Sequence, residues 1–186
     1  MRIVGGRMRG LGLTPLGKGD PKAHLRPTSD RVRESLFNLL EGGRFGAPVH
    51  GAMVLDLFAG TGALGLEALS RGAERVIFVE SGRIALRLLN ANIAKARAEG
   101  ETRVLTRDAT RLPPCDGAAA TLVFLDPPYG AGLAPKALEA ALKNGWIAQG
   151  ALVVAEEAAD IPPPEGFVRR DARRYGETWL TLMQAP

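Results

Sequence analysis

The sequence has little cysteine and histidine and no long apolar run, and each of these features argues against one class of protein. The 186 residues contain one cysteine, Cys115, so no disulfide can form within the chain. With only His24 and His50 besides, we expect no metal site. No apolar run approaches the roughly 20 residues that span a bilayer. The first residues turn to glycine and arginine before a signal-peptide apolar region can form. We therefore expect a cytoplasmic protein without a membrane partner.

Positive charge, by contrast, is present in excess and is concentrated at one end. The formal net charge is +4. Residues 1–50 hold nine Lys/Arg against four Asp/Glu, whereas the rest of the chain holds 15 against 16. Such a concentration attracts polyanions through Coulomb steering and counterion release. Nucleic acid is thus the natural partner, although basic N-termini are also common as merely solvated segments.

From residue 53 onward, short apolar runs alternate with helical stretches, which is typical of a parallel sheet wrapped by helices. Seven strands are expected, the last two as a terminal antiparallel hairpin: Met53–Phe58, Arg75–Glu80, Thr102–Thr106, Thr121–Asp126, Ala151–Glu156, Gly166–Arg174 and Thr178–Met183. Helices are expected over Ala63–Arg71, Arg83–Ala98 and Pro135–Asn144. The fold class is therefore α/β, with a Rossmann-like, mostly parallel seven-stranded sheet.

The segment before the sheet has a different character. Arg2–Leu13 is basic and glycine-rich, which indicates a small hairpin or an ordered loop. A helix follows Pro27, with residue 28, 29 or 30 as its N-cap. Its apolar residues form one stripe facing the sheet, and Arg31 and Arg33 lie away from it. We interpret residues 1–186 as one domain, with 1–48 a basic appendage on a core of residues 49–186.

A glycine-rich loop follows the first strand and opens a helix. Its glycines, Gly60, Gly62 and Gly65, allow positive φ and a close approach of backbone to ligand. Glu80 ends the second strand, where a carboxylate can hold ribose hydroxyls. These features fit a dinucleotide or S-adenosylmethionine equally well.

Asp56 favours S-adenosylmethionine over a dinucleotide, because a carboxylate at the end of the first strand repels a pyrophosphate. It suits the cationic amino and sulfonium groups of S-adenosylmethionine, although it could also merely cap the turn. Asp108, just after the third strand, is placed to accept a hydrogen bond from an adenine amino group. The predicted S-adenosylmethionine site therefore consists of Asp56, Phe58, Ala59, Gly60, Thr61, Gly62, Glu80, Asp108 and Ala109.

The strongest local signal is the tetrapeptide Asp126-Pro127-Pro128-Tyr129 at the end of the fourth strand, which resembles the [DNS]PP[YFW] motif of methyltransferases that modify exocyclic amines. The lone pair of an aromatic amine is delocalised into its ring, so the amine is a poor nucleophile. A carboxylate and a backbone carbonyl can accept its two N–H bonds and turn the lone pair toward a methyl donor. We assign these roles to Asp126 and Pro127, stiffening of the loop to the prolines, and stacking on the base to Tyr129.

Two motifs resemble those of methyltransferases. Asp56–Gly62 resembles the first motif of Rossmann-like methyltransferases, and Asp126–Tyr129 resembles the [DNS]PP[YFW] motif of enzymes that modify exocyclic amines. Residues 25–38 and the N-terminal Arg2–Gly6 resemble the RsmD family, the guanine-N2 methyltransferases of bacterial small-subunit rRNA. The resemblance covers nearly the whole chain. It implies a class I methyltransferase fold and an enzyme that methylates N2 of a guanine in small-subunit rRNA, naked or in an assembling subunit.

The candidate phosphate contacts are Arg2, Arg7, Arg9, Arg31 and Arg33. We expect a monomer. Two alternatives stay open: another amino-methyltransferase, acting on DNA adenine or cytosine or on protein glutamine, and a nucleic-acid-binding or NAD-binding protein without methyl transfer.

Overall fold

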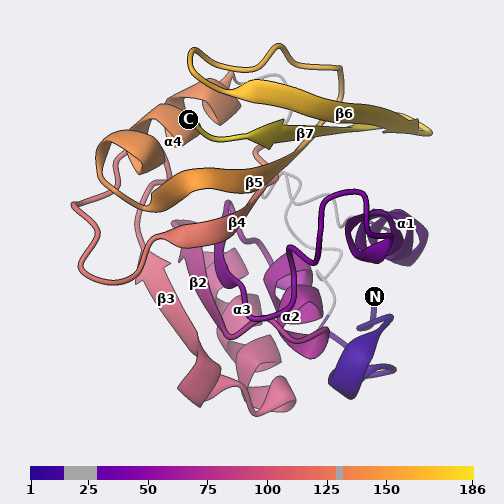
Figure 1. Ribbon diagram of the computed structural model, residues 1–186. Coiled ribbons are helices and arrows are strands. Elements are labelled where there is room, and N and C mark those ends of the chain that lie inside the picture. Colours follow the sequence, from indigo (N-terminus) through magenta and orange to yellow (C-terminus); the bar gives the residue numbers. More distant parts are fainter. Residues whose placement is uncertain (15–28, 129–131) are drawn as a thin grey trace.

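The computed structural model describes residues 1–14, 29–128 and 132–186, and its centre is one seven-stranded sheet (Figure 1). The strand order is β3-β2-β1-β4-β5-β7-β6. The strands are β1 (Met53–Leu57), β2 (Arg75–Glu80), β3 (Thr102–Thr106), β4 (Ala120–Leu125), β5 (Ile147–Glu157), β6 (Val168–Tyr175) and β7 (Thr178–Gln184). The expected α/β class with seven strands is confirmed.

The five strands from β3 to β5 are parallel, and the last two are antiparallel. β7 lies between β5 and β6, so the terminal hairpin is joined to the sheet through its second strand. β5 begins at Ile147, four residues before the expected start. The early part was not recognised because Gly150, at φ +72°, interrupts the apolar run, and the β4–β5 register shifts between Ala120 and Leu122.

Helices cover both faces of the sheet. The helices are α1 (Asp30–Glu41), α2 (Ala63–Ser70), α3 (Arg83–Ala96) and α4 (Leu133–Lys143), with short 3₁₀ turns η1 (Gly6–Met8) and η2 (Glu99–Glu101). Side chains of α1, α2 and α3 share one hydrophobic cluster with Val54 and Phe124, whereas α4 packs in a second cluster with Leu55 and Leu125. Neighbouring residues of β1 and β4 thus point to opposite faces, and both faces are covered, which explains why these strands are mostly apolar.

The N-terminal segment forms the expected hairpin, held by an antiparallel bridge between Arg2 and Gly12. Ser29 is the N-cap of α1, because its side chain accepts a hydrogen bond from the amide of Val32 (3.2 Å). Ile3 is fully buried and belongs to the cluster that contains Val54 of the sheet. The hairpin therefore contributes to the same core as the sheet. Within the described residues, no helix is long and apolar enough to cross a membrane.

Candidate active site

β1 and β4 lie side by side at the point where the strand order reverses. β2 and β3 follow β1 on one side of it in the sheet, whereas β4 and β5, which come next in the sequence, lie on its other side. Leu57 and Leu125, the last residues of the two strands, are register partners. The amide of Asp126 donates to the carbonyl of Leu57 (3.4 Å), so the loops after both strands begin next to each other. Open α/β sheets bind ligands in a crevice outside the carboxyl ends of the strands at such a switch point, and we use the name switch-point crevice for the corresponding position in this chain.

The loop after β1 has the backbone conformation that its glycines were predicted to provide. Gly60 and Gly62 have φ of +57° and +78°. A Cβ on Gly62 would lie 2.5 Å from Cδ1 of Leu89, and one on Gly65 would lie 2.4 Å from Cε1 of Phe78. Gly62 therefore serves both the turn and the packing of α2, and Gly65 allows α2 to approach β2 closely.

Phe58 opens this loop in a left-handed conformation, with φ of +60°. A non-glycine residue in this region is strained by about 1–3 kcal/mol and persists only where the surroundings hold it. The half-buried ring packs against the hydrophobic cluster that contains α4, Leu55 and Leu125, which we call the α4-side cluster, and this packing supplies that support. Ala59 and Thr61, also in the predicted cofactor set, are 8% and 7% exposed. Any contact of these two with a ligand is therefore expected to come mainly from their backbones.

Glu80 ends β2 and ties the glycine loop to it. Its Oε2 accepts a hydrogen bond from the amide of Gly60 (2.9 Å), and its Oε1 accepts from the amides of Ser81 and Gly82 (2.8 and 2.6 Å). Carboxylate oxygens each have two lone-pair directions, so acceptor capacity remains for a hydroxyl group. The half-buried side chain is thus held beside the loop where the sequence predicts a ribose ligand.

Asp56 lies beneath the same loop and is only 1% exposed. Its Oδ2 accepts from the amide of Gly65 in the first turn of α2 (2.9 Å), so the capping interpretation holds in the structure without ligand. Burial raises the pKa of this carboxyl from 3.8 to about 8; the Gly65 hydrogen bond opposes the rise, and the Glu80 charge adds to it. A cation in the crevice would favour the charged form of Asp56.

Asp108 and Ala109 follow β3 as expected. Oδ1 of Asp108 accepts from both the amide and the hydroxyl of Thr110 (2.9 and 2.8 Å). These hydrogen bonds lower the pKa of Asp108 below its usual value, so the exposed side chain is a charged acceptor near neutral pH. Ala109 is buried and packs in the α4-side cluster.

The Asp-Pro-Pro sequence lies directly after β4. Asp126 and Pro128 are half-buried and Pro127 is buried. Tyr129, the expected base platform, lies outside the described residues. Asp126 thus stands at the switch-point crevice, one register step beyond the Leu57–Leu125 pair.

The five candidate phosphate contacts differ in environment, and one prediction was wrong. Arg33 is fully buried on the packed face of α1, where it pairs with Asp30 (2.8 Å) and Glu67 (3.5 Å). Because the helix turns Arg33 inward to meet these carboxylates, it cannot reach a phosphate. We therefore correct its assignment to a structural residue.

The other four arginines are exposed. Arg2 pairs with Asp30 (3.6 Å), and Nη2 of Arg7 donates to both carboxylate oxygens of Glu101 (2.7 and 2.6 Å). Arg9 and Arg31 have no ion pair within the described part of the chain.

Glu67 organises this end of the molecule and was not predicted to do so. Its carboxylate, fully buried, accepts from the amides of Val4 and Gly5 (both 2.8 Å) and pairs with Arg71 (2.8 Å) and Arg33 (3.5 Å). It thereby joins the N-terminal hairpin, α1 and α2. The sequence did contain a signal of this role, since Glu67 is the single charged residue of α2. An unpaired charge there would be very unfavourable, so partners could have been anticipated.

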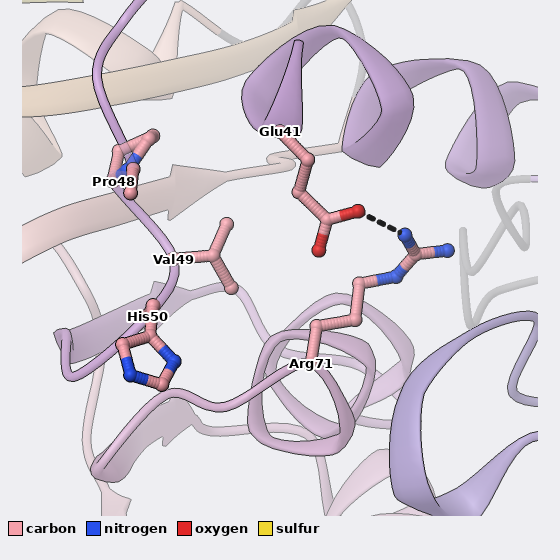
Figure 2. A pocket seen from close by; sticks show the side chains of 6 residues that line it. Glu41, Pro48, Val49, His50 and Arg71 are labelled. Carbon is pink, nitrogen blue, oxygen red and sulfur yellow. Dashed lines mark hydrogen bonds and ion pairs between the residues drawn. The ribbon is translucent and has the colours of Figure 1, made fainter. Parts of the chain in front are cut away.

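A small hollow lies elsewhere, between the end of α1 and the segment that leads into β1 (Figure 2). Its walls include Glu41 and Arg71, which are 2.7 Å apart, together with Val49 and His50. The volume of about 170 Å³ is below the roughly 300–1,000 Å³ of most small-molecule sites. The segment precedes β1, so the hollow lies at the amino end of that strand. It is therefore distinct from the switch-point crevice.

Comparison with known proteins agrees with this geometry. Residues 1–184 match the family described as Conserved hypothetical protein 95. Over 162 residues the chain is 41% identical to ribosomal RNA small subunit methyltransferase D of Escherichia coli K12, covering 86% of this chain and 76% of that one. The Haemophilus influenzae protein of the same name is 35% identical, with 99% and 93% covered. The solved structure of yhhF from Escherichia coli superposes with a TM-score of 0.82 at 36% identity, covering 100% of this chain and 97% of the other.

Proposed function

Because this chain belongs to the ribosomal RNA small subunit methyltransferase D family, we propose that it methylates the exocyclic N2 amine of one guanine in small-subunit rRNA, with S-adenosylmethionine as the donor. The names of the relatives support rRNA as the substrate and methyl transfer as the reaction. The motifs of this chain support S-adenosylmethionine as the donor and an aromatic amine as the acceptor.

One observation carries the proposal. The glycine loop after β1 and the Asp-Pro-Pro loop after β4 flank the same switch-point crevice, and they are held together by the hydrogen bond from Asp126 to Leu57. A cofactor loop and an amine-orienting loop must lie this close for donor and acceptor to meet. Holding two reactants in line can remove roughly 7–11 kcal/mol of the barrier.

The residues around the crevice fit a cationic nucleoside cofactor. S-adenosylmethionine, when bound, supplies an electrophilic methyl group on a sulfonium. Glu80 is placed to accept ribose hydroxyls, and Asp108 to accept from the adenine amino group. Buried Asp56, whose pKa of about 8 leaves it largely protonated near neutral pH, would ionise beside the cationic amino-acid end of the ligand. A pyrophosphate would gain no such partner and would meet the carboxylate of Glu80.

At the acceptor side, Asp126 accepts one N–H of the guanine amine and the Pro127 carbonyl accepts the other. The nitrogen lone pair then points at the methyl group. Asp126 takes up the proton that the amine loses during or after transfer. Pro128 stiffens the loop, and Tyr129 provides a stacking face for the base. Since a paired base could not reach these groups, the target guanine is unpaired or flipped out.

The polymer is held in part by the basic N-terminal region. Arg9 and Arg31 are the best placed, because both are exposed and neither is neutralised by a described carboxylate. Arg2 and Arg7 can contribute by exchanging their carboxylate partners for phosphates. The charge of this region steers RNA toward the crevice.

The test is transfer of labelled methyl from S-adenosylmethionine to three substrates: small ribosomal subunits that lack the modification, naked small-subunit rRNA, and DNA. We expect label in one or both ribosomal substrates, recovered as N2-methylguanosine after digestion. Asp126→Asn should abolish it while S-adenosylmethionine binding, measured by calorimetry, persists. Label only in DNA would overturn the substrate, and binding of NAD without S-adenosylmethionine would overturn the enzyme class.

A further inference from the structure

A second group of arginines lies at the opposite end of the chain, on the edge strand of the sheet. β6 is eight residues long, and among the described residues β7 is its one neighbouring strand. Four of its residues are exposed arginines, and Arg44, exposed in the segment after α1, contacts the same strand. We call this set the β6 arginine cluster; it consists of Arg44, Arg169, Arg170, Arg173 and Arg174.

Two carboxylates are shared among three of these arginines. Asp171, which lies on β6 itself, binds both Arg44 (2.9 Å) and Arg173 (3.1 Å). Asp160 binds Arg169 (2.8 Å). One anion between two guanidinium groups leaves a net positive charge and fixes the direction of both groups.

The remaining two arginines are held by neutral acceptors. Arg170 donates to the side-chain oxygen of Gln184 (2.6 Å), and Arg174 donates to the carbonyl of Gly176 (2.9 Å). Such partners orient a guanidinium without cancelling its charge. Even when Glu177 in the adjoining turn is counted with the two aspartates, the cluster keeps an excess of positive charge over the described residues.

The register places one end of this cluster at the edge of the sheet that carries the catalytic loop. Leu125 pairs with Ala155, and two residues further along β5 Glu157 pairs with Trp179 near the start of β7. The β6–β7 turn therefore lies at the same carboxyl edge as Asp126. In Figure 1 this turn projects toward the side of the molecule on which α1 lies.

α1 connects the cluster to the basic N-terminal hairpin. The buried Arg33 of α1 donates to the carbonyl of Arg2 in the hairpin. Past the other end of the helix, Arg44 pairs with Asp171 on β6. The 12 residues of α1 span about 18 Å at 1.5 Å per residue. Two basic surfaces are thus joined by one helix.

We propose that the β6 arginine cluster binds the sugar–phosphate backbone of the substrate RNA, beyond the nucleotide that enters the crevice. The proposal rests on the function proposed above. The exposed, oriented guanidinium groups match phosphates, which they bind with two parallel hydrogen bonds. Arg173 lies opposite Leu180, on the face of the sheet that α1 covers, whereas Arg169 lies opposite Met183 on the other face. The arginines on the α1 side of the cluster and the N-terminal hairpin then hold the RNA on either side of α1, so that the target guanine is presented at the edge where Asp126 lies.

The experiment compares the affinity of unmodified small-subunit rRNA for three full-length proteins across a range of salt concentrations. The test variant is Arg170→Gln/Arg173→Gln, which removes both charges and leaves polar side chains on the strand. The control is Arg75→Gln/Arg87→Gln, which removes two exposed arginines from β2 and α3. The association constant K falls as salt rises, and each arginine–phosphate interaction makes the slope of log K against log salt steeper by about 0.7–0.9. Removing one such interaction therefore makes the slope shallower by that amount and weakens binding about fivefold at 0.1 M salt.

We expect the test variant to bind RNA about 25-fold more weakly at 0.1 M salt, with a slope reduced by about 1.5, while S-adenosylmethionine binds as before. A further variant, Arg170→Lys/Arg173→Lys, should recover most of the slope because the charges return. The control should match the unmodified protein.

Charged side chains on an edge strand also hinder pairing with other sheets. If that were their whole role, the test and control variants would bind RNA equally, and the proposal would be overturned. Weakened binding to assembled subunits alone, with naked rRNA unaffected, would point to a ribosomal protein and would also overturn it. RNA binding is measured apart from methyl transfer, so a failure of the proposed reaction would be seen separately, as absence of label with the unmodified protein.

Discussion

The buried carboxylate of Glu67 provides the most demanding test of how this fold is held together. Glu67→Gln replaces one carboxylate oxygen by an amide NH₂ group of nearly the same shape. Both oxygens of Glu67 accept from N–H donors: one from Gly5 and Arg71, the other from Val4. Whichever oxygen is replaced, an NH₂ group then faces a backbone N–H. The buried guanidinium of Arg33 also loses its charged partner on α2.

The magnitude of the destabilisation can be worked out from these interactions. Hydrogen bonds to a charged group contribute about 1.5–3 kcal/mol each, and breaking a buried ion pair costs about 3–5 kcal/mol. These contributions overlap, so we expect the free energy of unfolding to fall by about 4 kcal/mol. At about 2 kcal/mol per molar urea, the unfolding midpoint falls by about 2 M.

The assay is urea unfolding followed by circular dichroism, with hydrogen exchange at the amides of Val4 and Gly5. Both amides should lose protection in the variant. The control is Asp116→Asn, which breaks the exposed pair with Arg103 (2.6 Å) and should leave the midpoint nearly unchanged. A midpoint shift in Glu67→Gln no larger than in this control would refute the reasoning. In Arg33→Met/Glu67→Met, removal of both charges should restore part of the stability.

Three further predictions concern the crevice. Asp126→Asn should lower kcat by at least about 10²-fold, since it removes the proton acceptor, with the dissociation constant of S-adenosylmethionine unchanged in calorimetry. Asp56 has a folded-state pKa of about 8 against 3.8 for the free side chain, so the free energy of unfolding should fall as the pH rises from about 4 to about 8. Asp56→Asn should flatten that dependence in urea titrations at pH 5, 7 and 8.5; an unchanged slope would contradict the assignment. Gly62→Ala places a Cβ 2.5 Å from Leu89 at φ +78°, and it should weaken cofactor binding and lower stability by about 1–3 kcal/mol. Normal affinity in a stable Gly62→Ala protein would count against the loop geometry.

The central strands β1, β2 and β4 were predictable because they are mostly apolar on both faces. β2 and β3 have the expected bounds, β1 ends one residue earlier than expected, and β4 begins and ends one residue earlier than expected. A continuous apolar run bounded by charge or glycine leaves little choice of limits. β5 was cut short because Gly150 breaks its pattern, and local sequence does not show that the strand resumes on the same neighbour.

The order of the residues around the crevice was also predictable, because Asp56, Glu80, Asp108 and Asp126 each end or follow a strand. Parallel strands bring their carboxyl ends to one edge, so position along the chain fixes position in space. The surroundings of arginines were harder to predict. Arg31 and Arg33 differ by two positions on one helix, yet Arg33 is buried because Glu67, 34 residues away, faces it. A pairing between distant segments leaves no periodic signal in either.

The position of β7 between β5 and β6 has a consequence for how the sheet is completed during synthesis. β6 is made before β7, yet β7 is its one strand neighbour among the described residues. Until residues 178–184 leave the ribosome, β6 has nowhere to dock and β5 presents an open edge whose backbone groups can pair with another chain. Chains are made at about 5–20 residues per second, so this interval lasts on the order of seconds. Like charges repel, so the arginines of β6 on two such chains would oppose pairing between their unfinished sheets.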